Sequence, residues 1–207
     1  MTIINSDAVP TIRDAMKQEK DANIKLKAAQ ALGCLGQHTE DHAKVLAEKG
    51  VLKELMEIIN EENKKKESKS DGQYSQNPNQ DLLDACKDAA KKIINNCKSV
   101  QALDELIVAE SPDQMKTPNE MLILVLKQLL KILPSNNQAK RKFAEGLHKL
   151  LLLKEEISKR PNPDKTIESI IDDICKIYPP DLVNYYTPNF EKKMAEKLDK
   201  FSQPADV

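Results

Sequence analysis

The sequence predicts an all-α, right-handed armadillo/HEAT-like solenoid of about three to four repeats with a C-terminal aromatic cap. Three observations carry this prediction. The composition is 40% hydrophobic and 31% charged with only 5 glycines, which favours helices. Apolar residues recur at helical spacing along most of the chain. A pair of segments, each with apolar residues on one helix face, also occurs twice along the chain.

The internal repeat relates two segments near the N-terminus to two segments further along. Residues 8–16 superimpose on residues 51–59 at an offset of 43, with apolar residues in matching places. Residues 24–35 superimpose on residues 82–93 at an offset of 58, which is the first offset plus a 15-residue insertion. A period of about 42 residues built from helices is typical of armadillo and HEAT arrays.

Local signals predict the first helices in order. Residues 22–37 place Ile24, Ala28, Ala31, Leu32 and Leu35 on one helix face. The small Ala and Gly residues of this segment allow a neighbouring helix to approach closely. Thr39 is an N-cap and Gly50 a stop signal, so residues 39–50 predict a short helix, followed by an apolar-faced helix over residues 51–60.

Later segments complete the array. Residues 61–79 are charged, polar and free of aliphatic side chains, so we interpret them as a disordered insertion between two helices of one repeat. An apolar helix over 119–133, a short-helix, Gly, long-helix unit over 136–157 and a last helix over 164–178 follow. We therefore assign residues 1–178 to armadillo-like repeats and residues 179–207 to a C-terminal capping tail and helix.

The aromatic residues gather in the last segment. The chain has 4 Tyr, 3 Phe and no Trp, and five of these aromatics lie within residues 178–201. Pro179 and Pro180 stop the last repeat helix. Tyr185, Tyr186 and Phe190 then either cover the end of the stack or anchor a partner, and the two roles are compatible.

The N-terminal repeat is expected to be incomplete, because residues 8–16 match the second helix of a repeat. The apolar sides of Val9, Ile12, Met16 and Ile24 should then lack an upstream neighbour. Truncation from a longer array, a missing gene segment and a docked partner would each explain this edge. We expect another protein chain to cover it, and name Val9 and Ile12 as partner-interface residues.

Two basic clusters could bind acidic partners. Lys64, Lys65, Lys66 and Lys69 could contact the acidic surface of a microtubule, but a solvated loop with its own acidic residues is the favoured interpretation. Lys140, Arg141 and Lys142 form a compact cluster on a predicted helix. An ordinary exposed face is favoured for this cluster too, although it is kept as a candidate interface.

Composition and motifs argue against several function classes. A net charge of −1 and a pI near 6.3 give no bulk positive field for nucleic acid. No apolar run approaches the roughly 20 residues that span a membrane. The 4 cysteines are far apart and indicate reduced core thiols of a cytosolic protein.

We predict neither catalysis nor a cofactor or metal. Cys34, His38 and His42 are spaced four apart, but a helix break before Thr39 separates them. The sequence has no nucleophile loop and no Gly-rich phosphate cradle, so an enzyme is not expected.

Four stretches resemble one family. They are ALGCLGQHTEDHAKVLAEKGVL (31–52), CKSVQALDELI (97–107), LKQLLKILPSNNQAKRKFAEGLHKL (126–150) and the ending YPPDLVNYYTPNF (178–190). These resemble the armadillo-repeat family of the ciliary central apparatus, the sperm-associated antigen six family. The resemblance covers nearly the whole chain but corresponds only to the C-terminal part of the family's longer arrays, and the insertion at 61–79 departs from it.

The resemblance implies a non-catalytic scaffold of the axonemal central apparatus that supports ciliary or flagellar beating. It implies a cytoplasmic, axonemal location and other axonemal proteins as partners. We expect one partner to be another armadillo chain at the N-terminal edge, with microtubules as a further candidate. The alternative is a cytosolic armadillo adaptor that binds a peptide in a groove of third helices, although the absence of Trp argues against an import-receptor mechanism.

Overall fold

The computed structural model describes residues 7–67, 79–107 and 117–187, in which helices are joined by turns and no strand occurs. The predicted all-α solenoid is confirmed. The helices are α1 (Ala8–Gln18), α2 (Ala22–His38), α3 (Glu40–Glu48), α4 (Val51–Glu67), α5 (Gln80–Asn96), α6 (Val100–Asp104), α7 (Asn119–Ile132), the 3-10 helix η3 (Leu133–Ser135), α8 (Asn137–Phe143), α9 (Gly146–Ser158), α10 (Lys165–Cys175) and α11 (Pro180–Tyr186).

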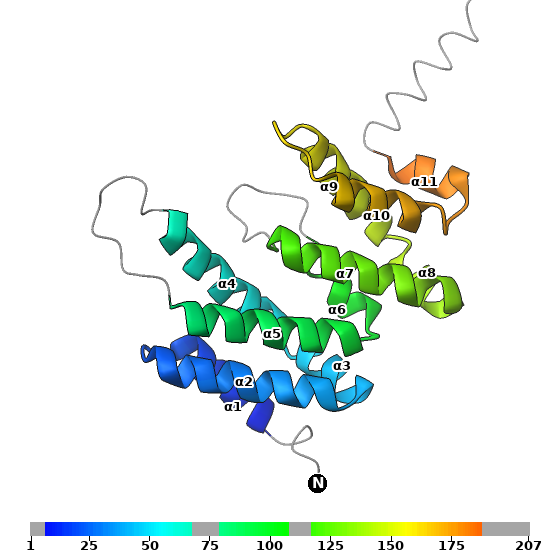
Figure 1. The fold of residues 1–207 in the computed structure, drawn as a ribbon. Helices are drawn as coiled ribbons and strands as arrows, with labels where there is room; N and C mark the ends of the chain where they lie inside the picture. The colour runs from blue at the N-terminus through cyan, green and yellow to red at the C-terminus, as the bar shows by residue number, and fades with distance from the viewer. Residues whose placement is uncertain (1–6, 68–78, 108–116, 188–207) are drawn as a thin grey trace, which may run out of the picture.

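The helices form two layers (Figure 1). One layer consists of α2, α5, α7 and α10, which run side by side and contact each other in that order. The other layer holds the remaining helices, with contacts from α1 to α4, from α3 to α6 and from α6 to α8. Because each helix contacts those just before and after it in the series, the core is continuous along the stack.

The order of helices follows the predicted repeat. The helices α3, α4 and α5 form one triplet, and α8, α9 and α10 form another. The pair α1 and α2 corresponds to α4 and α5 and therefore represents the second and third helices of a repeat. Between α6 and α7 the described chain is interrupted at residues 108–116.

Polar caps set the helix starts. The Thr39 side chain accepts a hydrogen bond from the backbone N–H of His42, and α3 begins at Glu40 as predicted. Gly50 has φ 77, a conformation that favours glycine and ends this short helix before α4. Other N-cap side chains are those of Asp21, Asn79, Ser99, Asn136 and Asp164.

The predicted start of the insertion is wrong. The structure continues α4 to Glu67, so residues 61–67 are helical, whereas residues 68–78 lie outside the described residues. Glu and Lys are good helix formers, and Glu62 is only 4% exposed. Its Oε2 accepts a hydrogen bond of 2.8 Å from the backbone N–H of Asn79, so Glu62 ties the end of α4 to the start of α5.

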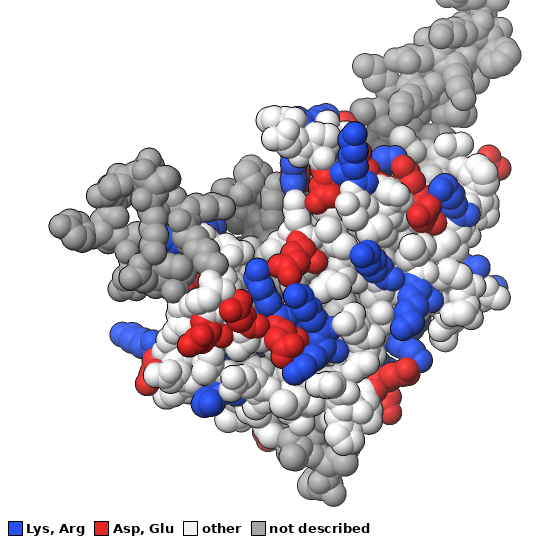
Figure 2. Space-filling view, in the orientation of Figure 1, with Lys and Arg blue, Asp and Glu red and all other residues white. Residues whose placement is uncertain are grey.

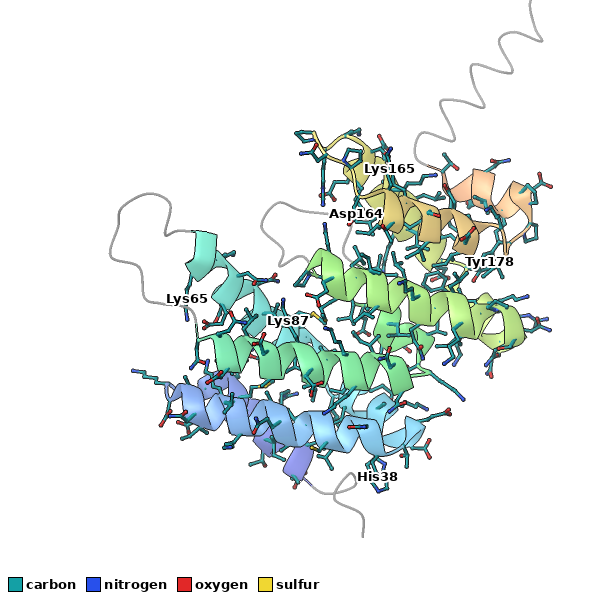
Figure 3. The ribbon with its side chains drawn as sticks, viewed as in Figure 1. His38, Lys65, Lys87, Asp164, Lys165 and Tyr178 are labelled. Atoms are coloured by element: carbon teal, nitrogen blue, oxygen red, sulfur yellow. The ribbon has the colours of Figure 1, made fainter. Side chains whose placement is uncertain are left out.

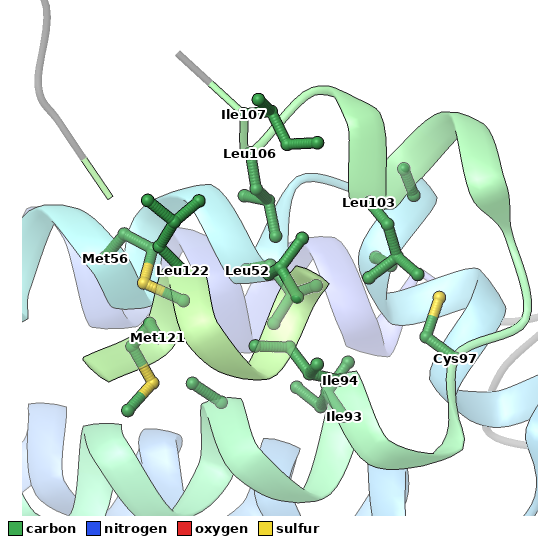
Figure 4. Packing of buried hydrophobic residues seen from close by; sticks show 14 of the residues in the cluster. Leu52, Met56, Ile93, Ile94, Cys97, Leu103, Leu106, Ile107, Met121 and Leu122 are labelled. Carbon is green, nitrogen blue, oxygen red and sulfur yellow. The ribbon is translucent and has the colours of Figure 1, made fainter. Parts of the chain in front are cut away.

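The core is built mainly of aliphatic side chains. The helices α2 and α5 approach each other closely at the glycines of α2. A Cβ built on Gly33 would lie 3.0 Å from Cα of Ala89, so no larger residue fits there without movement. This confirms that the small residues of α2 permit close approach. Further along, the side chains of α4, α5 and α7 meet in one apolar space (Figure 4), which includes Leu52, Ile93 and Met121.

Candidate interaction surfaces

The N-terminal edge differs in part from the prediction. Val9 and Met16 are fully buried within the chain, so they do not form part of an uncovered apolar surface at this edge. The reason is that α1 packs on α2 and α4, which turns one side of α1 into the chain's own core. Ile12 is partly buried, whereas Ile24 is 44% exposed. The uncovered apolar surface therefore lies on Ile12 and Ile24 and does not include Val9.

The basic cluster on α8 is split between two environments. Lys140 is partly buried, and its backbone carbonyl accepts a hydrogen bond of 3.1 Å from the Tyr178 hydroxyl. Arg141 and Lys142 are exposed and line a hollow of about 470 Å³ between α6, α8 and α9. Only two of the three predicted cations therefore face the same space.

This hollow contains a polar pair that the sequence did not reveal. Lys149 Nζ lies 2.6 Å from Oδ2 of Asp104, while Oδ1 of Asp104 is buried without a hydrogen-bond partner. Gly146 leaves room for this carboxylate, because a Cβ there would lie 2.6 Å from Oδ1. The pair joins residues 45 positions apart, so no local sequence signal could have indicated it.

The C-terminal tyrosines have different environments. Tyr178 is 7% exposed, and burial raises the pKa of its hydroxyl to about 12. Pro180 does more than stop the previous helix, because it stands at the start of α11. Leu182, Val183 and Tyr186 pack against the core.

Tyr185 is 61% exposed and meets the Tyr186 ring edge to face, with ring centroids 5.1 Å apart. Tyr186 thus faces the stack while Tyr185 faces outward. Phe190 lies outside the described residues, so the predicted cap is described only as far as Thr187.

Cys34 and His38 are exposed on α2, whereas His42 is partly buried on α3, after the break at Thr39. His38 lies at the C-terminal end of α2 (Figure 3), and the ring of His42 on α3 is 5.0 Å from it, centroid to centroid. Within residues 7–67, 79–107 and 117–187, no group of three or more His, Cys, Asp or Glu side chains could hold a metal ion.

Burial disfavours thiolate chemistry at three cysteines. It raises the pKa of the Cys86 thiol to about 12 and raises the pKa values of Cys97 and Cys175. A nucleophilic cysteine requires the opposite shift, because the thiolate is the reactive form. These three side chains serve packing.

The charged surface is mixed. Acidic and basic side chains lie next to one another on the face shown in Figure 2. Among the ion pairs of the described residues, Glu120 pairs with both Lys87 and Lys91. Lys65 pairs with Glu62 on α4, and Lys69 lies outside the described residues. None of the helices in the described part of the chain is long and apolar enough to cross a bilayer.

Comparison with known proteins identifies two relatives. Sperm-associated antigen 6 of mouse and of human are each 28% identical to this chain over 194 residues. The matched region covers 93% of this chain and 33% of each relative, so the chain spans about a third of their length. No protein-family model matches the chain.

A solved engineered protein is 12% identical to this chain and aligns with it at a TM-score of 0.42, over 90% of this chain and 69% of that protein. The similarity to sperm-associated antigen 6 agrees with the four stretches of sequence that resemble this family, and with the stacked helices of the fold. The chain is therefore similar to the armadillo-repeat protein sperm-associated antigen 6 over nearly its whole length, and its partial coverage of these relatives fits their C-terminal part.

Proposed function

We propose that this protein is a non-catalytic, protein-binding scaffold of the axonemal central apparatus and supports ciliary or flagellar motility. The observation that carries the proposal is the similarity to sperm-associated antigen 6 over 93% of the chain. A similarity of this extent involves the stacked helices as a whole and is not confined to one motif. The name of the relatives associates them with sperm, a flagellated cell.

The physical character of the chain supports a binding role. A solenoid presents a long surface on a continuous core, which suits it to hold other proteins in fixed positions. Arg141 and Lys142 at the hollow and the outward-facing Tyr185 offer contacts of two kinds, charged and aromatic. We place the protein in the cytoplasm, in the axoneme, with other axonemal proteins as partners and microtubules as a further candidate.

The test is the location of the protein in a ciliated or flagellated cell that expresses it. A tagged chain should remain with axonemes after detergent removes the membrane, and electron tomography should place the tag on the central pair. Loss of the protein should impair beating. A chain found only in the detergent-soluble fraction, or only on the outer doublets, would contradict the proposal, and the soluble location would favour the cytosolic adaptor.

A further inference from the structure

The short helix α8 brings two cations to the hollow between α6, α8 and α9. Ala139 and Phe143 of this helix, one turn apart, are 6% and 1% exposed, so they fix the side of α8 that faces the core. Arg141 and Lys142 lie between them in the sequence and therefore on other sides of the helix. Both side chains are exposed, and both line the hollow of about 470 Å³.

These two cations have no acidic partner among the described residues. On the neighbouring helix α9, Lys149, Lys154 and Lys159 are each ion-paired with an acidic side chain. By contrast, Arg141 and Lys142 form no ion pair with any described residue, although the exposed Glu145 lies only a few positions further along the chain. Their charges are therefore available to another molecule.

Lys149 adds a third cation to the hollow, and Asp104 holds it in place. Nζ of Lys149 lies 2.6 Å from Oδ2 of Asp104, whose other oxygen is buried against Gly146 without a hydrogen-bond partner. An ammonium group carries three N–H donors, of which Asp104 takes one. Because the Lys149 side chain is 44% exposed, its remaining donors are open to a ligand in the hollow.

The charges of the hollow suit a carboxylate. Arg141, Lys142 and Lys149 are positive and Asp104 and Glu145 are negative, so three positive charges against two negative ones leave an excess of +1. One carboxylate compensates this excess. The planar guanidinium of Arg141 also presents pairs of N–H donors that match the two oxygens of a carboxylate.

A peptide fits these charges better than a nucleic acid does. Asp104 and Glu145 would repel a backbone that carries a phosphate at every nucleotide. A peptide can present one carboxylate to Arg141 and Lys142 and neutral groups to the acidic side chains. The volume of the hollow lies within the roughly 300–1,000 Å³ that is common for ligand sites, so it has room for more than one side chain.

We propose that this hollow binds an acidic peptide segment of a partner protein, in which Arg141 and Lys142 contact a carboxylate and Lys149 makes a further contact. The proposal rests on the proposed scaffold function and names a class of partner for it. The residues that line the hollow belong to α6, α8 and α9 or to the turn before α9, and none belongs to the layer of α2, α5, α7 and α10 (Figure 1).

The test measures the binding of a fluorescein-labelled oligoglutamate peptide to the full chain by fluorescence anisotropy at low ionic strength. The wild type should bind this peptide, more weakly as salt is added, and should not bind an oligoglutamine peptide of the same length. Arg141→Glu combined with Lys142→Glu should weaken binding roughly tenfold or more, because two attractive charges become repulsive. Glu145→Gln should strengthen binding by about twofold to fivefold, because it removes a repulsive charge from the hollow.

A matched control reverses the same charges elsewhere. Lys127 and Lys131 are exposed cations of α7 that do not line the hollow and form no ion pair with a described residue. Lys127→Glu combined with Lys131→Glu changes the net charge of the chain equally and should change the affinity by less than about twofold, because screening weakens distant charges. Circular dichroism melting checks that the variants fold.

Carbodiimide coupling locates the peptide on the wild-type chain, so it tests the site even if a variant unfolds. The reagent joins a carboxylate to a lysine amine that it contacts, and mass spectrometry identifies the joined peptides. Coupling is expected at Lys142 and Lys149.

No binding of oligoglutamate, equal losses in the two double variants, or coupling mainly to Lys127 and Lys131 would each overturn the proposal. An acidic segment of this same chain seated in the hollow would block the peptide and give the first of these outcomes. Tighter binding of an oligothymidylate than of oligoglutamate would indicate a nucleic-acid site and would overturn it too. Peptide binding is scored with the purified chain and axonemal location in cells, so failure of the hollow and failure of the scaffold function are distinguishable.

Discussion

Gly36 of α2 lies against Ile93 of α5 so closely that a Cβ added to the glycine would be 2.4 Å from Cγ1 of Ile93. Ile93 is fully buried, so it cannot move toward solvent without disturbing its neighbours. The helix pair therefore depends on the absence of a side chain at position 36.

Gly36→Ala is expected to lower the free energy of unfolding by about 1–2 kcal/mol. Because the added Cβ would lie only 2.4 Å from Cγ1 of Ile93, we take the upper part of the usual overpacking cost, about 2–3 kcal/mol, and the better helix propensity of Ala offsets about 1 kcal/mol of it. Urea unfolding followed by circular dichroism measures the difference. Gln37→Ala, at an exposed position next in sequence, is the control and should change stability by less than about 0.5 kcal/mol. A Gly36→Ala protein as stable as the control would show that the contact is looser than described.

Gln128 joins α7 to the end of α5. Its side chain is buried, and Nε2 donates a hydrogen bond of 2.9 Å to the backbone carbonyl of Cys97. Gln128→Met keeps the size of the side chain but leaves the carbonyl without this donor, so we expect a loss of about 1–3 kcal/mol in urea unfolding. Gln101→Met, at an exposed position on α6, should have little effect. Equal stability of the two variants would contradict a structural role for this bond.

The ion pairs of Glu120 predict a pH-dependent contribution to stability. Its hydrogen bonds to Lys91 and then to Lys87 lower the pKa of the carboxyl from 4.5. The contribution is therefore present above pH 4.5, the unfolded value, and is lost as the pH falls through the lower folded pKa. Since the Glu120 side chain is 48% exposed, we expect roughly 0.5 kcal/mol.

The measurement compares the wild type with Glu120→Gln in urea unfolding near neutral pH and again well below the carboxyl's pKa. The stability difference should shrink at the acidic pH and in high salt. A difference that grows on acidification would have the wrong sign and would contradict these ion pairs.

The cysteines predict a graded pattern of thiol labelling. Cys34 is exposed, while Cys86 and Cys97 are fully buried. At mildly alkaline pH a thiol reagent should label Cys34 rapidly, and it should label Cys86 and Cys97 only when the chain unfolds. Burial raises the pKa of Cys86 to about 12, which slows its reaction further. Cys34→Ser should remove the fast phase, and a fast phase that persists would show that a second thiol is accessible.

Local patterns predicted much of the fold. The two offsets of the internal repeat, the Thr39 cap and Gly50 identified helices that the structure places where expected. These signals act within one helix or one turn, so they can be read from neighbouring residues. The boundary at residue 61 was missed because a charged run is compatible with both a loop and an exposed helix, and the buried contact of Glu62 with Asn79 decides between them.

The sequence by itself determined the helices, their repeated order and the resemblance to sperm-associated antigen 6, because helical periodicity, capping residues and short matching stretches are local properties of the chain. Only the tertiary structure decided which apolar residues are covered. Val9 and Ile24 are equally apolar in a helical pattern, yet packing of α1 on α4 buries Val9 and leaves Ile24 open. Likewise, Asp104 and Lys149 meet only when successive repeats stack. Burial and pairing depend on which helix lies opposite, and that relationship is set by contacts between residues far apart in sequence.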